Sequence, residues 1–314
     1  MNSLIWSNSA FINLMSSLVQ YHPRSFREFR YVYPVISRRA GGLSLGINLS
    51  PNGQCNFSCV YCQVIAENGR QRIDTKSESD LIDCDCNCIE SELSQLIGMI
   101  KSGDLFKDEW FSRAPAEKRI LKDIAFSGDG EPTLSPAFDE TINRVVSVRK
   151  RLCNESTKIV LITNATMLHV KHVQDSLETM LKNNGEIWAK LDAGTPEYFK
   201  KIARSAIKYE KILTNLKELT KKFPVVIQSC FLSMHGKIPD ESEIRQYAQR
   251  LIDLQSNNNN NNNTSNNIIR VQMYTVARST PESWALPISN EQLDSIAETV
   301  RKLTGLQVDT FYSA

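Results

Sequence analysis

The chain has 314 residues, of which 41% are hydrophobic, so it is long enough for one large α/β domain or two small ones. A formal net charge of +2 does not indicate a protein that binds nucleic acid or an anionic membrane surface through its overall charge. The apolar first twenty residues lack Lys and Arg and are interrupted by polar residues, which matches neither a signal peptide nor a membrane span. We therefore expect a cytoplasmic protein with no membrane partner.

Residues 1–40 are predicted to form an N-terminal extension and residues 41–314 the main domain. In the main domain, short β-branched runs alternate with longer segments of helical period, a rhythm typical of βαβ units and a parallel sheet. The predicted strands are Leu45–Ser50, Asp123–Ser127, Lys158–Thr163, Glu186–Asp192, Val225–Phe231 and Ile268–Tyr274. The predicted helices are Ile89–Ser102, Ala137–Arg151, Val170–Lys182, Tyr209–Lys222, Glu241–Gln255 and Asn290–Leu303. This order suits an open doubly wound sheet or a partial barrel, and in both folds ligands bind at the carboxyl ends of the strands.

Two segments depart from this rhythm. Residues 256–267 contain seven consecutive asparagines and are predicted to form a disordered insertion, because such a tract buries no apolar surface. The stretch Arg24–Arg39 interleaves Arg with Phe and Tyr. That pattern suits a strand or cap packed against the sheet with arginines at its rim, and it equally suits stacking on bases with phosphate contact.

The strongest chemical signal is the spacing of Cys55, Cys59 and Cys62, which follow the first predicted strand. Three thiolates close three corners of a 4Fe-4S cube and leave the fourth iron open to another ligand. A structural zinc site is the alternative, but it requires four protein ligands, and no further Cys or His lies nearby in the sequence. The spacing therefore predicts an open iron-sulfur cluster.

These cysteines, with Tyr61 just before the last, resemble the signature of the radical S-adenosylmethionine (SAM) superfamily. The resemblance implies a partial (β/α)6 barrel and two cofactors, a 4Fe-4S cluster and SAM, with Tyr61 beside them. It implies that the amino and carboxylate groups of SAM bind the open iron, and that one-electron reduction releases methionine and a 5'-deoxyadenosyl radical. The radical would abstract hydrogen from an unknown substrate, with flavodoxin or ferredoxin as the expected electron donor.

A glycine-rich acidic motif, Gly128-Asp129-Gly130-Glu131, follows the second predicted strand. Glycines let the backbone approach a ligand closely, and carboxylates accept hydrogen bonds from an ammonium group, although the same pattern also forms ordinary turns. In the superfamily, a motif at this position binds the amino group of SAM. The resemblance therefore assigns all four residues to cofactor binding.

Polar residues also stand at the other strand ends. Lys190 and Asp192 share strand parity, Gln228 lies in the fifth predicted strand, and Asn164 and Arg278 follow the third and sixth. Polar side chains that face a barrel lumen suit a polar ligand, whereas the alternative is that Lys190 and Asp192 pair only with each other. We assign Lys190 to catalysis, because a lysine binds an anionic group or, once deprotonated, attacks a carbonyl. The other four are assigned to cofactor binding.

Three short segments are most similar to the superfamily branch that contains the wyosine-base synthesis enzymes, which act on transfer RNA. They are Gly46–Pro51, Gly130–Leu134 and Lys190–Ala193. The resemblance makes transfer RNA a candidate substrate.

A second cysteine run, Cys84, Cys86 and Cys88, is spaced too tightly for a usual cluster loop and lacks a fourth cysteine, which favours a local peculiarity over an auxiliary cluster. Two other functions compete with an enzyme. An iron-sulfur electron carrier or sensor needs a cluster closed by four protein ligands and has no use for polar strand ends. A nucleic-acid-binding module with structural zinc needs a more basic face. The sequence favours the enzyme.

Overall fold

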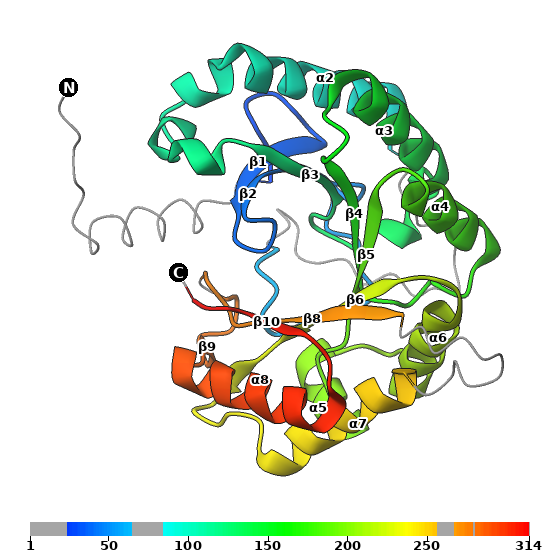
Figure 1. Cartoon of the computed structure of the whole chain (residues 1–314), viewed down its shortest axis with the longest axis vertical. Helices are drawn as coiled ribbons and strands as arrows, with labels where there is room; N and C mark the ends of the chain where they lie inside the picture. The colour runs from blue at the N-terminus through cyan, green and yellow to red at the C-terminus, as the bar shows by residue number, and fades with distance from the viewer. Residues whose placement is uncertain (1–23, 65–83, 256–266, 279, 314) are drawn as a thin grey trace.

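The computed structural model describes residues 24–64, 84–255, 267–278 and 280–313. An eight-stranded sheet curls into part of a barrel, in the order β1-β2-β3-β4-β5-β6-β8-β10 (Figure 1). Neighbouring strands from β2 to β10 run parallel, and β1 pairs antiparallel with β2 at one edge. The strands of this sheet are β1 Val32–Ser37, β2 Gly42–Ile47, β3 Leu121–Phe126, β4 Lys158–Thr163, β5 Gly185–Lys190, β6 Val225–Cys230, β8 Ile268–Tyr274 and β10 Val308–Phe311. The expected partial barrel is confirmed.

The helices cover the outer face of the curled sheet (Figure 1). They are α2 Cys86–Ser102, α3 Phe138–Leu152, α4 Lys171–Leu181, α5 Pro196–Ala203, α6 Tyr209–Lys222, α7 Glu241–Gln255 and α8 Asn290–Thr304. Short 3-10 turns span Asp104–Lys107, Phe111–Arg113, Ala116–Lys118 and Pro132–Leu134, and β7 Leu232–Met234 pairs with β9 Ala285–Pro287 in a separate two-stranded sheet. Within the described ranges, every helix is too short or too polar to cross a membrane.

The predicted alternation of strands and helices is confirmed, with boundaries that differ by up to three residues. The largest shift is in β2, which ends at Ile47 because the Asn48 side chain accepts the Ser50 N–H and turns the chain. β5 ends at Lys190, so Asp192 lies just beyond the strand and not in it. The sequence patterns missed α5, β7, β9 and β10.

The segment from Arg24 to Arg39 contains β1, so the middle of this segment is a strand of the sheet. The predicted division at residue 40 falls inside the β1–β2 hairpin, where Ser37 pairs with Gly42. That division remains a prediction. Residues 1–23 of the expected extension and 256–266 of the expected insertion lie outside the described residues.

A small buried apolar cluster lies apart from the main core between sheet and helices, and it consists of Ala125, Val160, Trp188 and Val226. Glu186 binds Lys158 and Arg270 and accepts a hydrogen bond from the Trp188 indole of this cluster. Polar ligands are expected toward the carboxyl ends of the parallel strands, where such barrels bind them.

Glu92 of α2 fixes the start of β1. Its carboxylate is buried and accepts the backbone N–H groups of Arg30, Tyr31 and Val32 at 2.8, 2.9 and 2.9 Å. In the part of the chain that the structure describes, β1 is an edge strand of the sheet, so the carboxylate satisfies donors that no neighbouring strand there reaches.

Glu92→Ala should lower the free energy of unfolding by about 3 kcal/mol, because it leaves several buried N–H groups without an acceptor. Urea unfolding of the cluster-free protein measures this. The control is Glu140→Ala, which removes an exposed partner of Arg144 and should cost under about 1 kcal/mol. Equal losses in the two variants would contradict the tethering role of Glu92.

Candidate active site

All of the predicted site residues except Asp129 line one cavity of about 290 Å³ in the lumen of the barrel. The lining includes all three residues of the cysteine triplet, together with Glu131 and Lys190. It also includes Tyr61, Gly128, Gly130, Asn164, Asp192, Gln228 and Arg278. The topology therefore brings together loops that are far apart in the sequence, because parallel strands end at the same edge of the sheet.

The loop that carries the triplet rests on α5. The N–H groups of Ser58 and Val60 donate to the carbonyls of Ala203 and Ile202 at 2.9 and 3.0 Å, and Phe57 packs edge-on against Phe199. All three cysteines lie outside disulfides, are partly exposed and line the cavity. The loop is thus held by backbone contacts and by the packing of Phe57.

The donor set of the triplet fits an open cubane cluster. A structural zinc ion needs four ligands that converge on one point, and among the residues described no three His, Cys, Asp or Glu side chains do so. Three thiolates that each bind a different iron do not have to converge. Burial raises the pKa of the Cys59 thiol, and the nearby Cys62, Asp192 and Cys55 raise it further, so the thiol stays protonated until a metal displaces the proton.

The acidic loop after β3 packs tightly against the cysteine loop. A Cβ on Gly130 would lie 1.8 Å from the carbonyl oxygen of Gln54, and the neighbouring Glu131 N–H donates to that oxygen at 3.3 Å. Gly128 has a φ of +134°, and a Cβ there would lie 2.7 Å from the Asn48 side chain. Both positions therefore require glycine.

Glu131 is 2% exposed and binds protein groups from two strand ends. Its carboxylate accepts from the Thr163 hydroxyl at 2.7 Å, from the Asn164 N–H at 2.7 Å and from the Thr133 N–H and hydroxyl. Burial raises its pKa, and these hydrogen bonds oppose that rise. Asp129 likewise binds protein groups, the Arg24 guanidinium at 2.7 Å and the Asn48 amide at 2.8 Å. Cofactor binding by both carboxylates remains a prediction.

Asn164 and Gln228 line the cavity and differ in how far the protein satisfies their amides. The Asn164 amide donates to Asn56 at 2.7 Å and lies 3.9 Å from the sulfur of Cys55, and its oxygen accepts from the Thr166 N–H and hydroxyl. Gln228 donates to Gln272 at 3.0 Å, while its Oε1 is buried and has no hydrogen-bond partner in the described structure. A buried acceptor without a partner is costly, so a polar ligand in the cavity would satisfy it.

Lys190 and Asp192 form an ion pair of 2.9 Å, with side chains only 12% and 11% exposed. Asp192 also accepts the Tyr61 hydroxyl and the Cys230 N–H, and Lys190 donates to the Tyr274 hydroxyl. Burial alone would lower the pKa of Lys190, but the charge of Asp192 and the contact with Tyr274 outweigh it and raise the pKa, so the amine is protonated. The two residues do pair, and both still line the cavity.

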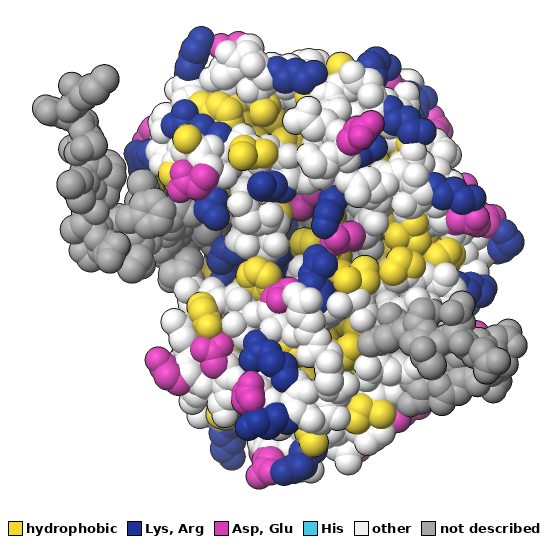
Figure 2. All heavy atoms as spheres, in the orientation of Figure 1, with side chains coloured by type: hydrophobic (Ala, Val, Ile, Leu, Met, Phe, Trp, Pro, Cys, Tyr) yellow, Lys and Arg dark blue, Asp and Glu magenta, His cyan; other side chains and the backbone are white. Residues whose placement is uncertain are grey.

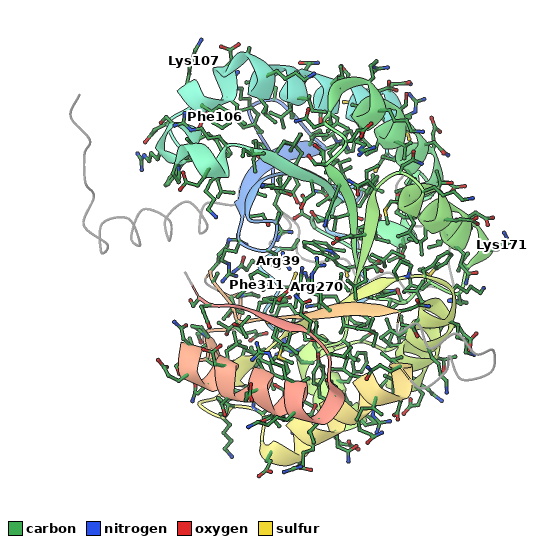
Figure 3. All side chains as sticks on the ribbon, viewed as in Figure 1. Arg39, Phe106, Lys107, Lys171, Arg270 and Phe311 are labelled. Carbon is green, nitrogen blue, oxygen red and sulfur yellow. The ribbon has the colours of Figure 1, made fainter. Side chains whose placement is uncertain are left out.

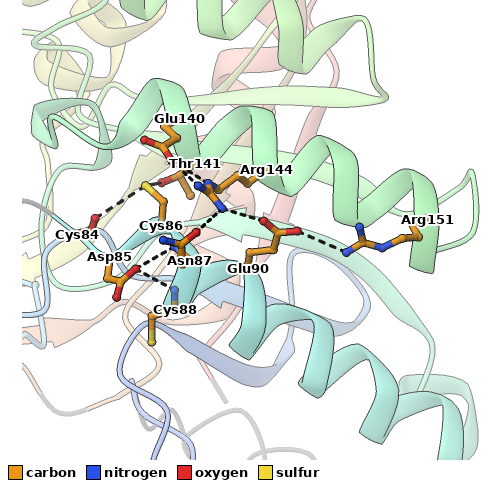
Figure 4. Close-up of polar contacts among 10 residues, drawn as sticks. All are labelled: Cys84, Asp85, Cys86, Asn87, Cys88, Glu90, Glu140, Thr141, Arg144 and Arg151. Atoms are coloured by element: carbon orange, nitrogen blue, oxygen red, sulfur yellow. Dashed lines mark hydrogen bonds and ion pairs between the residues drawn. The ribbon is translucent and has the colours of Figure 1, made fainter.

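The second cysteine run belongs to the start of α2 (Figure 4). Asp85 caps the helix by accepting the N–H groups of Asn87 and Cys88 at 2.9 and 3.0 Å. The sulfur atoms point to different partners: Cys84 to the Leu49 carbonyl, Cys86 to the Thr141 hydroxyl and Cys88 to the Glu92 carboxylate. This arrangement supports a packing role for the run.

Arg38, Arg39 and Asp123 also line the cavity, and the sequence patterns did not assign them to the site. Arg38 and Arg39 were noticed only as part of a basic and aromatic stretch. Their position became visible once β1 and β2 formed a hairpin, because the turn places both residues beside the lumen.

A family model for the Radical SAM superfamily matches residues 49–251, which include the triplet, the acidic loop and the Lys190–Asp192 pair. The chain belongs to this superfamily. Radical SAM proteins are enzymes that use a 4Fe-4S cluster and SAM, and the donor set described above fits the first of these cofactors.

Individual relatives are distant. A UPF0026 protein of Synechocystis sp. is 28% identical over 202 residues, which cover 62% of this chain and 61% of that protein. This chain therefore spans less than two thirds of that relative. A structure of TYW1 with a lysine-pyruvate adduct bound has a TM-score of 0.51 and 13% identity, and the match covers 95% of this chain and 90% of that one. Streptococcus suis SuiB bound to SAM has a TM-score of 0.53 and 13% identity, with 88% and 52% covered. At 13% identity, the similarity of these two structures to the chain shows a shared fold and nothing more.

Asp123, buried in the cavity wall, should make stability depend on pH. Burial raises its pKa from 3.8 to about 6, although the Ser44 hydroxyl donates to it. The folded state therefore loses about 3 kcal/mol as pH rises from 4 to 7 and the buried carboxyl ionises. Asp123→Asn removes this loss. The free energy of unfolding of the cluster-free variant, relative to that of the wild type, should therefore increase as pH rises. A difference that stays constant across this range would contradict the shifted pKa.

Proposed function

We propose that this radical SAM protein holds its cluster on Cys55, Cys59 and Cys62 and modifies a substrate bound in the lumen of the barrel. The observation that carries the proposal is that the triplet, the acidic loop and the Lys190–Asp192 pair line a single cavity. An electron carrier has no need for a polar cavity beside its cluster. When bound, the cluster would supply one electron that splits SAM into methionine and a 5'-deoxyadenosyl radical, which takes a hydrogen atom from the substrate.

The chain's own residues have separate roles in this proposal. Glu131 braces the acidic loop so that the backbone of Gly128 and Gly130 borders SAM, with Tyr61 near the cluster. Asn164, Gln228 and Asp192 offer acceptors and donors for the amino acid and ribose parts of SAM. Their support is geometric, since all of them line the cavity.

Lys190 is the residue that we assign to the substrate. Its protonated amine suits an anionic group, and release from Asp192 would free it to lose a proton and attack a carbonyl. The similar fold of TYW1, whose structure has a lysine-pyruvate adduct bound, supports a lysine in such a role. The same likeness, with the motif resemblance, makes transfer RNA the first substrate to test.

The electron would come from reduced flavodoxin or ferredoxin, and we place the protein in the cytoplasm. Clustered cysteines in a long chain suit metal or redox chemistry in a reducing compartment more than they suit disulfides.

Anaerobically reconstituted protein should hold about four irons and, once reduced, convert SAM slowly to 5'-deoxyadenosine and methionine without substrate. Replacing Cys55, Cys59 and Cys62 together by Ala should abolish both the iron load and the product, because no thiolate remains to bind the cluster. Iron analysis and chromatography measure these outcomes. Cys88→Ala is the control and should retain both. A full iron load in the triple variant would refute the cluster assignment, and absence of deoxyadenosine from the clustered wild type would favour the carrier.

Lys190→Met should leave the iron load and substrate-free deoxyadenosine formation unchanged, while product formation from transfer RNA falls about a hundred-fold or more. Asp192→Asn should chiefly weaken SAM binding, measured by equilibrium dialysis. If both variants kept normal turnover and SAM affinity, the pair would have only a structural role.

A further inference from the structure

The lumen contains two arginines to which the proposed function gives no role, Arg38 and Arg39, and both come from the turn between β1 and β2. Arg278, a residue assigned to cofactor binding from the sequence, follows β8. All three line the same cavity as the cysteines. Figure 2 shows Lys and Arg side chains gathered around the hollow between the two halves of the molecule, and Figure 3 places Arg39 between the β1–β2 part and the β8–β10 part of the sheet.

The hairpin turn is built to present these side chains. Ser37 accepts the Gly41 N–H on its carbonyl at 3.0 Å and the Ala40 N–H on its hydroxyl at 3.1 Å, and Gly41 has a φ of +76°. These bonds use the backbone of the loop and leave both arginine side chains free to enter the lumen. The turn lies at the amino end of β2, whereas the cysteine loop follows its carboxyl end, so the two arginines enter from the opposite end of the strand.

The charges of Arg38 and Arg39 are not balanced by an ion pair in the described residues. Burial raises the pKa of Asp123 and the charge of Arg39 opposes that rise, but no ion pair joins these two side chains among the residues described, and Asp192 binds Lys190. The Arg38 Nη1 atom is buried without any hydrogen-bond partner. Burial and the neighbouring Arg39 lower the pKa of Arg38 to about 10, and burial together with Arg39, Arg38 and Arg24 lowers that of Arg278 to about 9. A folded protein keeps such a costly group when a ligand compensates it.

Arg39 connects this group to the proposed reaction site. Its guanidinium lies 5.9 Å from the Trp188 ring centroid and 5.2 Å from that of Tyr274. The Lys190 amine lies 4.6 Å from the same Tyr274 ring. An anion held by Arg39 would therefore lie near Lys190, beside the rings of Trp188 and Tyr274.

We propose that Arg38 and Arg39, assisted by Arg278, bind a phosphate group of the substrate. A phosphate monoester carries a charge of about −1.5 to −2 at neutral pH, which matches several guanidinium groups better than the single charge of a carboxylate does. SAM has one anionic group, its carboxylate, which the superfamily resemblance assigns to the open iron. A phosphodiester of RNA carries a single charge, but its two unesterified oxygens accept paired hydrogen bonds from the same guanidinium groups. The proposal thus deepens the proposed function by naming the substrate class, a phosphorylated small molecule or RNA.

The test measures binding to the cluster-loaded protein under anaerobic conditions with SAM present. Calorimetry compares ribose 5-phosphate with ribose, and a short RNA hairpin in the presence and absence of inorganic phosphate. Arg38→Met and Arg39→Gln should each weaken binding of the phosphorylated probe about ten-fold or more and leave SAM affinity unchanged. The control is Arg245→Gln, an exposed arginine paired with Glu241 on α7, which should bind like the wild type.

Thermal unfolding provides a second measurement, which distinguishes a ligand-binding role of Arg38 from a purely structural one. Arg38→Met should raise the Tm of the protein, because it removes a buried guanidinium nitrogen without a partner, and it should abolish the rise in Tm that the phosphorylated probe causes in the wild type. A lower Tm in Arg38→Met, with the probe-induced rise intact, would overturn the proposal.

The two probes separate the two sources of phosphate. Tight binding of ribose 5-phosphate supports a small phosphorylated substrate, and phosphate-sensitive binding of the hairpin alone supports RNA. Two outcomes would overturn the proposal. In the first, ribose and ribose 5-phosphate bind equally well, and neither inorganic phosphate nor the arginine variants change binding of the hairpin. In the second, the arginine variants lose affinity for SAM. Failure of the proposed function would show itself separately, as absence of 5'-deoxyadenosine from protein that still binds the phosphorylated probe.

Discussion

The active-site end of this barrel depends on the buried carboxylate of Glu131. It accepts hydrogen bonds from Thr133, Thr163 and Asn164, and so joins the ends of β3 and β4, while its own N–H binds the Gln54 carbonyl in the cysteine loop. Asn164, held in this way, reaches Asn56 and lies beside Cys55. A buried carboxylate is tolerated only when its oxygens are hydrogen-bonded, so the network sets the positions of all the groups it contacts.

Asp192 has a comparable role on the other side of the lumen. Its carboxylate binds Lys190, the Tyr61 hydroxyl and the Cys230 N–H, and therefore couples β5 and β6 to the cysteine loop. The same contact keeps Lys190 protonated. Any chemistry that needs the neutral amine must first separate this pair, which makes Asp192 a control on Lys190 as well as a candidate ligand for SAM.

Some polar groups around the lumen are hydrogen-bonded to the protein and others have no partner there, and this difference indicates where ligands are expected. Glu131 and Asp129 both bind protein groups and hold the loops around them, and their contact with SAM remains a prediction. Gln228 Oε1 and Arg38 Nη1 are buried without partners among the residues described. Unsatisfied buried groups destabilise a fold, and proteins retain them chiefly where a ligand completes them. The two atoms therefore mark where SAM and substrate are expected to contact the protein.

Local patterns in the sequence were enough to predict six parallel strands and six of the helices, and to single out the cysteine triplet as the proposed cluster ligands. Strand and helix periods depend on side chains a few residues apart, and the triplet lies within a single loop, so these features need no knowledge of distant contacts. Only the tertiary structure decided that β1 closes one edge of the sheet, that Glu131 serves as a brace and that Lys190 pairs with Asp192. It also decided that Arg38 and Arg39 enter the lumen, because that position depends on which strands become neighbours. Pairing between distant segments is set by the burial of a shared core, which no single stretch of the sequence encodes.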